Sequence, residues 1–238
     1  MPLPQISTPT YELVIPSSKK KVKFRPFLVK EEKILILAME SEDPKQIANA
    51  VKDVIGSCIL SKGIRVDKLS TFDIEYIFLN IRGKSVGEDI EIMVTCPDDE
   101  KTQVPTVIHL DEIKVHIDKE HSPDIKLDDT YTMRMKYPSL NEFVKTNLSS
   151  GGDLAIDDTF DLIASCVDQV YSEEESWAGS DCTKKELSDF VGSLNSKQFK
   201  DVEKFFDTMP KLSHKVKVKN PNTDVESEIV LEGLQSFF

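Results

Sequence analysis

The sequence has few residues of the kinds that build disulfide or metal sites. Its 238 residues include 4 cysteines and 4 histidines. The cysteines, at positions 58, 96, 166 and 182, lie far apart in the chain. Cys58 and Cys166 fall on the apolar faces of predicted helices, so we expect both to be buried small hydrophobic residues. Scattered thiols of this kind are typical of a reduced, cytosolic protein rather than a secreted protein held by disulfides.

Long apolar segments are also missing. No run approaches the roughly 20 apolar residues that a membrane-spanning helix needs. Met1–Pro4 has neither the charged nor the apolar part of a signal peptide. Hydrophobic residues make up 39% of the chain and charged residues 30%, which is typical of a globular protein with a proper core. We therefore expect no membrane partner.

The chain lacks an excess of positive charge. It has 30 lysines and arginines against 42 acidic residues, a net charge of −12. A protein that coats nucleic acid needs a basic surface, so this balance argues against that role. One basic segment stands out, the basic arm (19–25), which contains Lys20, Lys21, Lys23 and Arg25. Because of this segment, a nucleic-acid-binding adaptor is one possible function. The alternative is that the arm faces an acidic partner protein.

Catalytic and cofactor-binding signatures are absent as well. Gly83-Lys84-Ser85 resembles the end of a phosphate-binding loop, but the position that needs a glycine is Phe78, within a predicted helix. We instead expect Gly83 to end that helix. Cys96-Pro97 resembles the first half of a zinc knuckle, yet residues 97–100 supply no second thiolate or imidazole. We expect no enzyme, no cofactor and no metal site, with Cys96 at most a remnant of one.

The hydrophobic pattern predicts an α+β fold. Alternating apolar residues predict an N-terminal hairpin over 11–27, and helical periodicity follows in three segments. The period then returns to two, which predicts central antiparallel strands. A short helix is expected after Pro138, and Ser149–Gly152 is expected to be a flexible joint. The predicted helices cover 30–40, 43–58 and 70–81, and the predicted strands cover 90–94, 107–110, 113–117 and 130–136.

The C-terminal part is predicted to be helical and closed by a β-hairpin. Helices are expected from Asp157 or Asp158 to Val167, after the capping box that starts at Thr183, and after Ser196. Residues 172–181 are expected to form a loop. Residues 211–232 alternate on both sides of an Asn-Pro-Asn-Thr-Asp turn, with a basic first strand and an acidic second strand. The predicted domains are 1–148 and 153–238, with the joint at 149–152.

Two turns in the sequence resemble each other. Cys96–Glu100 and Asn220–Asp224 each carry proline in second position, and each is followed by apolar residues at similar spacing. Because a predicted helical set precedes each turn, the chain could consist of two related halves. The alternative is that proline-containing hairpin turns arose independently.

Segments at both ends of the chain resemble the baseplate hub proteins of T-even-like tailed phages. The N-terminal segments are Tyr11–Leu13, Lys20–Phe27 and Lys30–Lys33, and the C-terminal segments are Met209–Leu212 and Leu231–Phe238. The similarity extends over essentially the whole chain. Some relatives carry a Cys-Pro-x-Cys-Gly knuckle where this chain has Cys96–Glu100 and Asn220–Asp224, which puts a metal role in doubt here.

The resemblance implies a late protein of a contractile-tail phage that acts in assembly of the central baseplate hub. Its partners would be other hub proteins, and it would be found in the host cytoplasm during assembly or in the virion baseplate. We expect an assembly factor, a chaperone for the hub, because the predicted joints at 149–152 and 172–181 suit transient binding. A structural hub subunit is the alternative. The candidate partner-binding residues are Lys20, Lys21, Lys23, Arg25, Leu234, Phe237 and Phe238, although the C-terminal apolar residues could instead pack within the chain.

Overall fold

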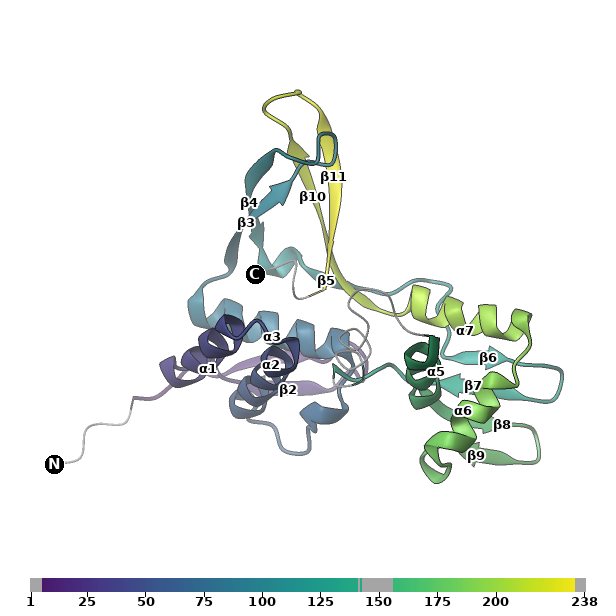
Figure 1. Cartoon of the computed structure of the whole chain (residues 1–238). Helices are drawn as coiled ribbons and strands as arrows, with labels where there is room; N and C mark the ends of the chain where they lie inside the picture. Colours follow the sequence, from purple (N-terminus) through teal and green to yellow (C-terminus); the bar gives the residue numbers. More distant parts are fainter. Residues whose placement is uncertain (1–5, 141, 143–155, 234–238) are drawn as a thin grey trace. The chain divides into compact units, whose positions relative to one another are not determined.

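The computed structural model describes residues 6–140, 142 and 156–233. Its helices and small antiparallel sheets confirm the α+β class (Figure 1). The chain folds into two compact units. Unit 1 comprises the described residues within 1–66, 72–116 and 211–238, and unit 2 those within 67–71 and 117–210. Within the described residues, no helix combines the length and the apolar character that crossing a membrane requires.

Unit 1 begins with the predicted hairpin and helices. β1 (Tyr11–Val14) pairs antiparallel with β2 (Lys21–Phe24). The helices that follow are α1 (Val29–Glu40), α2 (Pro44–Cys58) and α3 (Thr71–Val86), with a 3-10 turn at Val66–Lys68. Side chains of the hairpin and of α2 and α3 are almost fully buried, including Val22, Phe24, Val54, Ile55, Ile77, Phe78 and Ile81.

Local side-chain chemistry fixes where two of these helices begin. The Asp43 carboxylate accepts a hydrogen bond from the Lys45 backbone N–H, as predicted for an N-cap followed by Pro44. At the start of α1, the buried Glu31 carboxylate accepts from the Leu28 backbone N–H at 2.8 Å. This contact satisfies one of the N–H groups that the first turn leaves unpaired.

Two β-hairpins complete unit 1. β3 (Asp89–Thr95) pairs with β4 (Gln103–His109), and β10 (Lys211–Lys219) pairs with β11 (Glu226–Glu232). After a 3-10 turn at Leu110–Glu112, β5 (Lys114–His116) joins the free edge of β10 and makes a three-stranded sheet in the order β11-β10-β5. Apolar residues of both hairpins share one core, which includes Ile90, Val94, Ile108, Leu212, Val216 and Val218.

The division into units differs from the domain boundary expected from the sequence. The expected joint at 149–152 lies outside the described residues. The closing hairpin, which we expected to belong with the C-terminal helices, is part of unit 1. The reason is its pairing partner: Lys211–Ser213 of β10 hydrogen-bond with Lys114–His116 of β5, almost 100 positions earlier in the chain.

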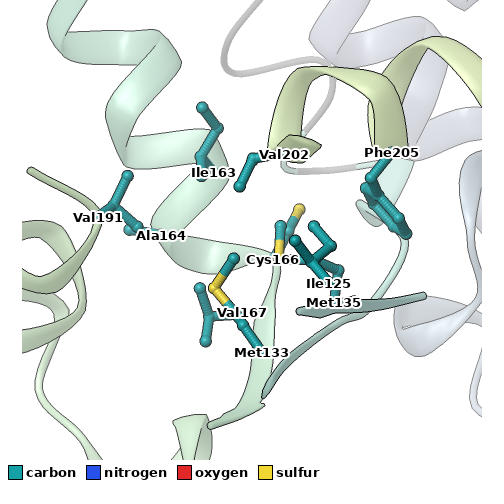
Figure 2. Packing of buried hydrophobic residues seen from close by; sticks show 10 residues of the cluster. All are labelled: Ile125, Met133, Met135, Ile163, Ala164, Cys166, Val167, Val191, Val202 and Phe205. Carbon is teal, nitrogen blue, oxygen red and sulfur yellow. The ribbon is translucent and has the colours of Figure 1, made fainter. Parts of the chain in front are cut away.

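Unit 2 is a four-stranded antiparallel sheet packed against three helices. The sheet order is β6-β7-β8-β9, formed by β6 (Asp124–Lys126), β7 (Thr132–Met135), β8 (Val167–Tyr171) and β9 (Ser176–Ala178). The helices are α5 (Ile156–Ser165), α6 (Lys184–Gly192) and α7 (Ser196–Thr208). Figure 2 shows the buried side chains between them, among which Met133, Ala164, Cys166 and Val202 are fully buried.

Three details of unit 2 differ from the prediction. The helix expected to reach Val167 ends at Ser165, because Val167 begins the strand that pairs with β7. The expected loop at 172–181 contains β9 and a 3-10 turn at Gly179–Asp181. The last helix is capped by Asn195 rather than Ser196, since the Asn195 side chain accepts from the backbone N–H groups of Lys197 and Gln198.

Other local predictions have a mixed outcome. The capping box at Thr183 and Glu186 is confirmed, with Glu186 N–H donating to Thr183 Oγ1. Gly83 does not end its helix: α3 continues to Val86. A Cβ at Gly83 would lie 2.6 Å from Leu110 Cδ1, so the glycine instead allows Leu110 to pack closely against the helix. The start of the short helix expected after Pro138 is seen, but most of it lies outside the described residues.

Candidate partner-binding surfaces

The two similar turns of unit 1 share two features of the main chain. In each turn the N–H of the fifth residue donates to the carbonyl of the first, Glu100 to Cys96 at 3.0 Å and Asp224 to Asn220 at 2.9 Å. The fifth residue is left-handed in both, with φ of 55° at Glu100 and 63° at Asp224. The likeness seen in the sequence therefore extends to this main-chain hydrogen bond and to the left-handed fifth residue. The chain does not divide into two units that each consist of a helical set and the hairpin after it. Helices α5–α7 belong to unit 2, while the hairpin after them belongs to unit 1.

Side-chain hydrogen bonds join the two turns to each other, at the tips of hairpins that lie side by side (Figure 1). The Asp98 carboxylate accepts from Asn220 Nδ2 at 3.0 and 3.1 Å and from Thr223 Oγ1. Asn222 Nδ2 donates to Thr102 Oγ1 at 3.0 Å. The hydrogen bonds from Thr223 and Asn220 lower the pKa of Asp98, so the carboxylate is charged at neutral pH.

The turn pair does not fit a structural zinc ion. The positions that carry cysteine in a pair of Cys-Pro-x-Cys knuckles hold Cys96, Asp99, Asn220 and Thr223. Structural zinc sites are built from thiolates and imidazoles, and neither an amide nor a hydroxyl replaces these well. Burial, together with the charges of Asp98 and Asp99, raises the pKa of the Cys96 thiol, which disfavours the thiolate. Among the described residues, no cluster of three or more metal-ligating side chains occurs.

The basic arm contributes less free charge than its sequence suggests. Lys20, Lys21 and Lys23 are exposed, but Lys23 Nζ lies 3.5 Å from a Glu12 carboxylate oxygen. The Arg25 guanidinium is largely buried and donates to Glu31 at 2.9 Å and to the Pro26 carbonyl at 2.9 Å. Arg25 therefore stabilises the start of α1. The other candidate partner-binding residues, Leu234, Phe237 and Phe238, lie outside the described residues.

An apolar groove lies between the helices of unit 1. It has a volume of about 620 Å³ and is lined by α1, α2 and α3. Ile34-Leu35-Ile36-Leu37 is a continuous apolar run, so α1 carries apolar residues on more than its inner face, and Ile36 and Met39 are each 50% exposed. Exposed apolar surface that lines a groove is typical of a protein-binding site.

A second groove, the α6–β9 groove, lies in unit 2. Its volume is about 500 Å³, and its apolar walls come from the sheet and from α6. The rings of Tyr131 and Trp177 lie 6.1 Å apart, and both side chains are more than a third exposed. Gly179 lies directly against β8: a Cβ there would be 2.3 Å from the Val167 carbonyl oxygen. The sequence patterns did not predict this groove, although Trp177 within the acidic stretch 173–181 was a signal for it.

Three of the four cysteines are buried. Burial raises the pKa of Cys58 to about 11 and that of Cys166 to about 12. Cys182 is half-buried and lines the α6–β9 groove. Thiols with raised pKa values react slowly as nucleophiles, so Cys58 and Cys166 act as apolar core residues, as predicted.

These features define a small α+β protein with apolar surface grooves in both units and, in one unit, a pair of hairpins joined by side-chain hydrogen bonds. The chain belongs to the T4 bacteriophage base plate protein family, whose model matches residues 8–238. No curated protein and no solved structure matches the chain. The family assignment agrees with the resemblance found at the two ends of the sequence.

Proposed function

We propose that this chain acts in assembly of the central hub of the phage baseplate, as a non-enzymatic assembly factor that binds other hub proteins. The family match over residues 8–238 supports a role in the baseplate, which is the observation this proposal starts from. The apolar grooves of the two units support it, because a protein that works by contact needs surface that can be buried against partners. A hub subunit retained in the virion would use the same surfaces and is the second candidate.

The basic arm supports a protein partner more than nucleic acid. Arg25 is engaged by Glu31, and Lys23 lies close to Glu12. With a net charge of −12 on the whole chain, the four exposed lysines of the arm are few compared with the contacts that phosphate-backbone binding needs. An acidic site on a hub protein is a better match for them.

The test is complementation of a phage that lacks this protein. Host cells would supply the wild-type chain or a chain truncated after Gly233, and hub intermediates would be separated by sedimentation. We expect hubs to form with the wild-type chain and to fail without it. Normal hub formation in the absence of the chain would overturn the proposal. Hub formation with the truncated chain would show that Leu234, Phe237 and Phe238 are not docking residues.

Control experiments separate loss of docking from loss of the fold. The truncated chain should keep the thermal unfolding midpoint of the wild-type chain within a few degrees, since the truncation leaves β10 and β11 complete. A large fall in the midpoint would mean that the terminal residues pack within the chain. In that case the failure of assembly would be a folding defect.

A further inference from the structure

The α6–β9 groove combines an apolar interior with a rim of one charge. Its apolar lining comes from separate parts of unit 2, with Leu127, Tyr131, Trp177, Leu187 and Phe190 as its large side chains. The charged residues that line it are Asp128 and Glu186. No lysine or arginine among the described residues lines the groove. Nearby Lys126 and Lys184 are paired with Asp129 and Asp161, at 3.0 and 2.5 Å.

Both rim carboxylates are charged, and among the described residues only one of the two oxygens in each accepts hydrogen bonds. Asp128 Oδ1 accepts from the backbone N–H groups of Thr130 and Tyr131, each at 2.7 Å. Glu186 Oε2 accepts from the N–H and the hydroxyl of Thr183, each at 2.7 Å. These hydrogen bonds lower the pKa of both carboxyl groups. Within the described part of the chain, Asp128 Oδ2 and Glu186 Oε1 accept no hydrogen bond, so each can receive one from a ligand.

We propose that the α6–β9 groove binds a short segment of a partner protein in which a large apolar side chain lies next to lysine or arginine. The apolar side chain would fill the space between Trp177, Leu187 and Phe190. The basic residue would donate to the free oxygens of Asp128 and Glu186, where a carboxylate partner would be repelled. This inference rests on the proposed function in one respect, which is that the ligand of the groove is a protein.

The edge of the sheet favours an extended segment as the occupant. β9 is the last strand in the order β6-β7-β8-β9, so one side of its backbone has no strand partner among the described residues. A peptide that adds to such an edge gains main-chain hydrogen bonds, while its alternate side chains enter the neighbouring pocket. Trp177 lies in the middle of β9, directly at this edge and in the groove wall.

Two reporters are already built into the groove. Trp177 is the single tryptophan of the chain, so intrinsic tryptophan fluorescence reports on the groove alone. Cys182 also lines the groove and is the one cysteine that is not buried. A bound segment would therefore change the Trp177 emission and slow the reaction of Cys182 with a thiol reagent.

The experiment titrates the full chain with a short synthetic peptide of alternating lysine and leucine, blocked at both ends. We expect a saturable blue shift of the Trp177 emission and slower modification of Cys182. One comparison peptide has glutamate in place of lysine, and a second has serine in place of leucine. Each should bind at least roughly tenfold more weakly, because one loses the charge match and the other the apolar contact.

Matched variants locate the effect. Asp128→Asn with Glu186→Gln removes two charges but keeps oxygens that can accept from Thr130, Tyr131 and Thr183, so the fold should persist. This variant should bind the lysine–leucine peptide about three- to tenfold more weakly. The control variant, Glu203→Gln with Asp207→Asn, removes the same charge from exposed positions on α7 and should bind like the wild-type chain.

Several results would overturn the proposal. They are the absence of a saturable signal from both reporters, equal binding of the lysine and glutamate peptides, and an equal loss of affinity in the rim variant and the control variant. None of these results bears on whether the chain is needed for hub assembly, since that is measured separately in infected cells. Conversely, the peptide could bind specifically while hubs form normally in the absence of the chain. That pair of results would support the α6–β9 groove as a binding site and would overturn the proposed function.

Discussion

The two hairpin turns of unit 1 share a main-chain hydrogen bond and a left-handed fifth residue, but they differ in side-chain chemistry. The β3–β4 turn supplies the acceptor, the Asp98 carboxylate, and the β10–β11 turn supplies the donors, Asn220 and Thr223. At the first position of each turn, one hairpin has a buried thiol, Cys96, and the other a buried amide, Asn220. In this chain, therefore, hydrogen bonds around one carboxylate join the two turns.

The largest effect is expected from restoring a full set of thiols. Asp99→Cys, Asn220→Cys and Thr223→Cys, together with the native Cys96, should create a four-thiolate site that binds one zinc ion per chain. Saturating zinc should then stabilise the variant by about 4 kcal/mol at a thousandfold excess over Kd. Cobalt substitution should give the absorption bands of tetrahedral thiolate coordination.

The wild-type chain is the control for that experiment. Its thermal midpoint should not change with chelator or with zinc, because Asn220 and Thr223 are poor zinc ligands. A folded four-cysteine variant that binds no zinc would show that the two turns are not placed like a pair of knuckles.

The next largest effect should come from Asn220→Leu. Asn220 is fully buried, donates to Asp98 and accepts from the Asn222 backbone N–H at 2.9 Å. Its loss should lower the free energy of unfolding by about 2–3 kcal/mol, the cost of removing hydrogen bonds to a charged group in a buried place. Asn222→Leu is the matched control, because Asn222 is exposed, and it should cost less than about 1 kcal/mol. Equal losses in a denaturant titration would rule out a special role for Asn220.

A smaller effect is expected from the charge of Asp98. Its pKa is lower in the folded chain than in the unfolded chain, so its contribution to stability is present above the unfolded value of about 3.9. That contribution is lost as the pH falls through the lower, folded pKa. Asp98→Asn should therefore flatten the decline in unfolding free energy between about pH 4 and pH 2. Glu91→Gln removes a carboxylate from an exposed position on β3 and is the comparison variant. An equally steep decline in both variants would contradict the assignment.

The smallest effect tests the likeness of the backbones. Glu100 and Asp224 occupy the left-handed region, which costs a residue with a Cβ about 1 kcal/mol more than glycine. Glu100→Gly and Asp224→Gly should each stabilise the chain by a few tenths of a kcal/mol, after the added entropy of the unfolded glycine is subtracted. The gain at Asp224 should be slightly lower, because its ion pair with Lys219 at 2.7 Å is lost. Opposite signs in thermal unfolding would show that the turns are not equivalent.

Features fixed by short-range chemistry could be predicted from the sequence. The N-cap at Asp43, the capping box at Thr183 and Glu186, and the alternation in β10 and β11 all act within a few residues, and each is present in the structure. The fold class followed from the same patterns. The family was predicted from the sequence segments at the two ends of the chain.

Features that depend on distant partners could not be predicted. Val167 begins a strand because β7 lies beside it, and Gly83 lies inside a helix where Leu110 packs too closely to leave room for a Cβ. The α6–β9 groove draws its lining from residues between Leu127 and Gln198, so no local pattern describes it. The engagement of Arg25 by Glu31 likewise depends on how β2 leads into α1.

The most direct test of the proposed function is quantitative mass spectrometry of this protein in purified mature virions and in hub intermediates from infected cells. An assembly factor should be present in the intermediates and absent from the virions. A fixed copy number in mature virions would contradict that account and make the chain a structural hub subunit. Absence from both would contradict a role in the hub altogether.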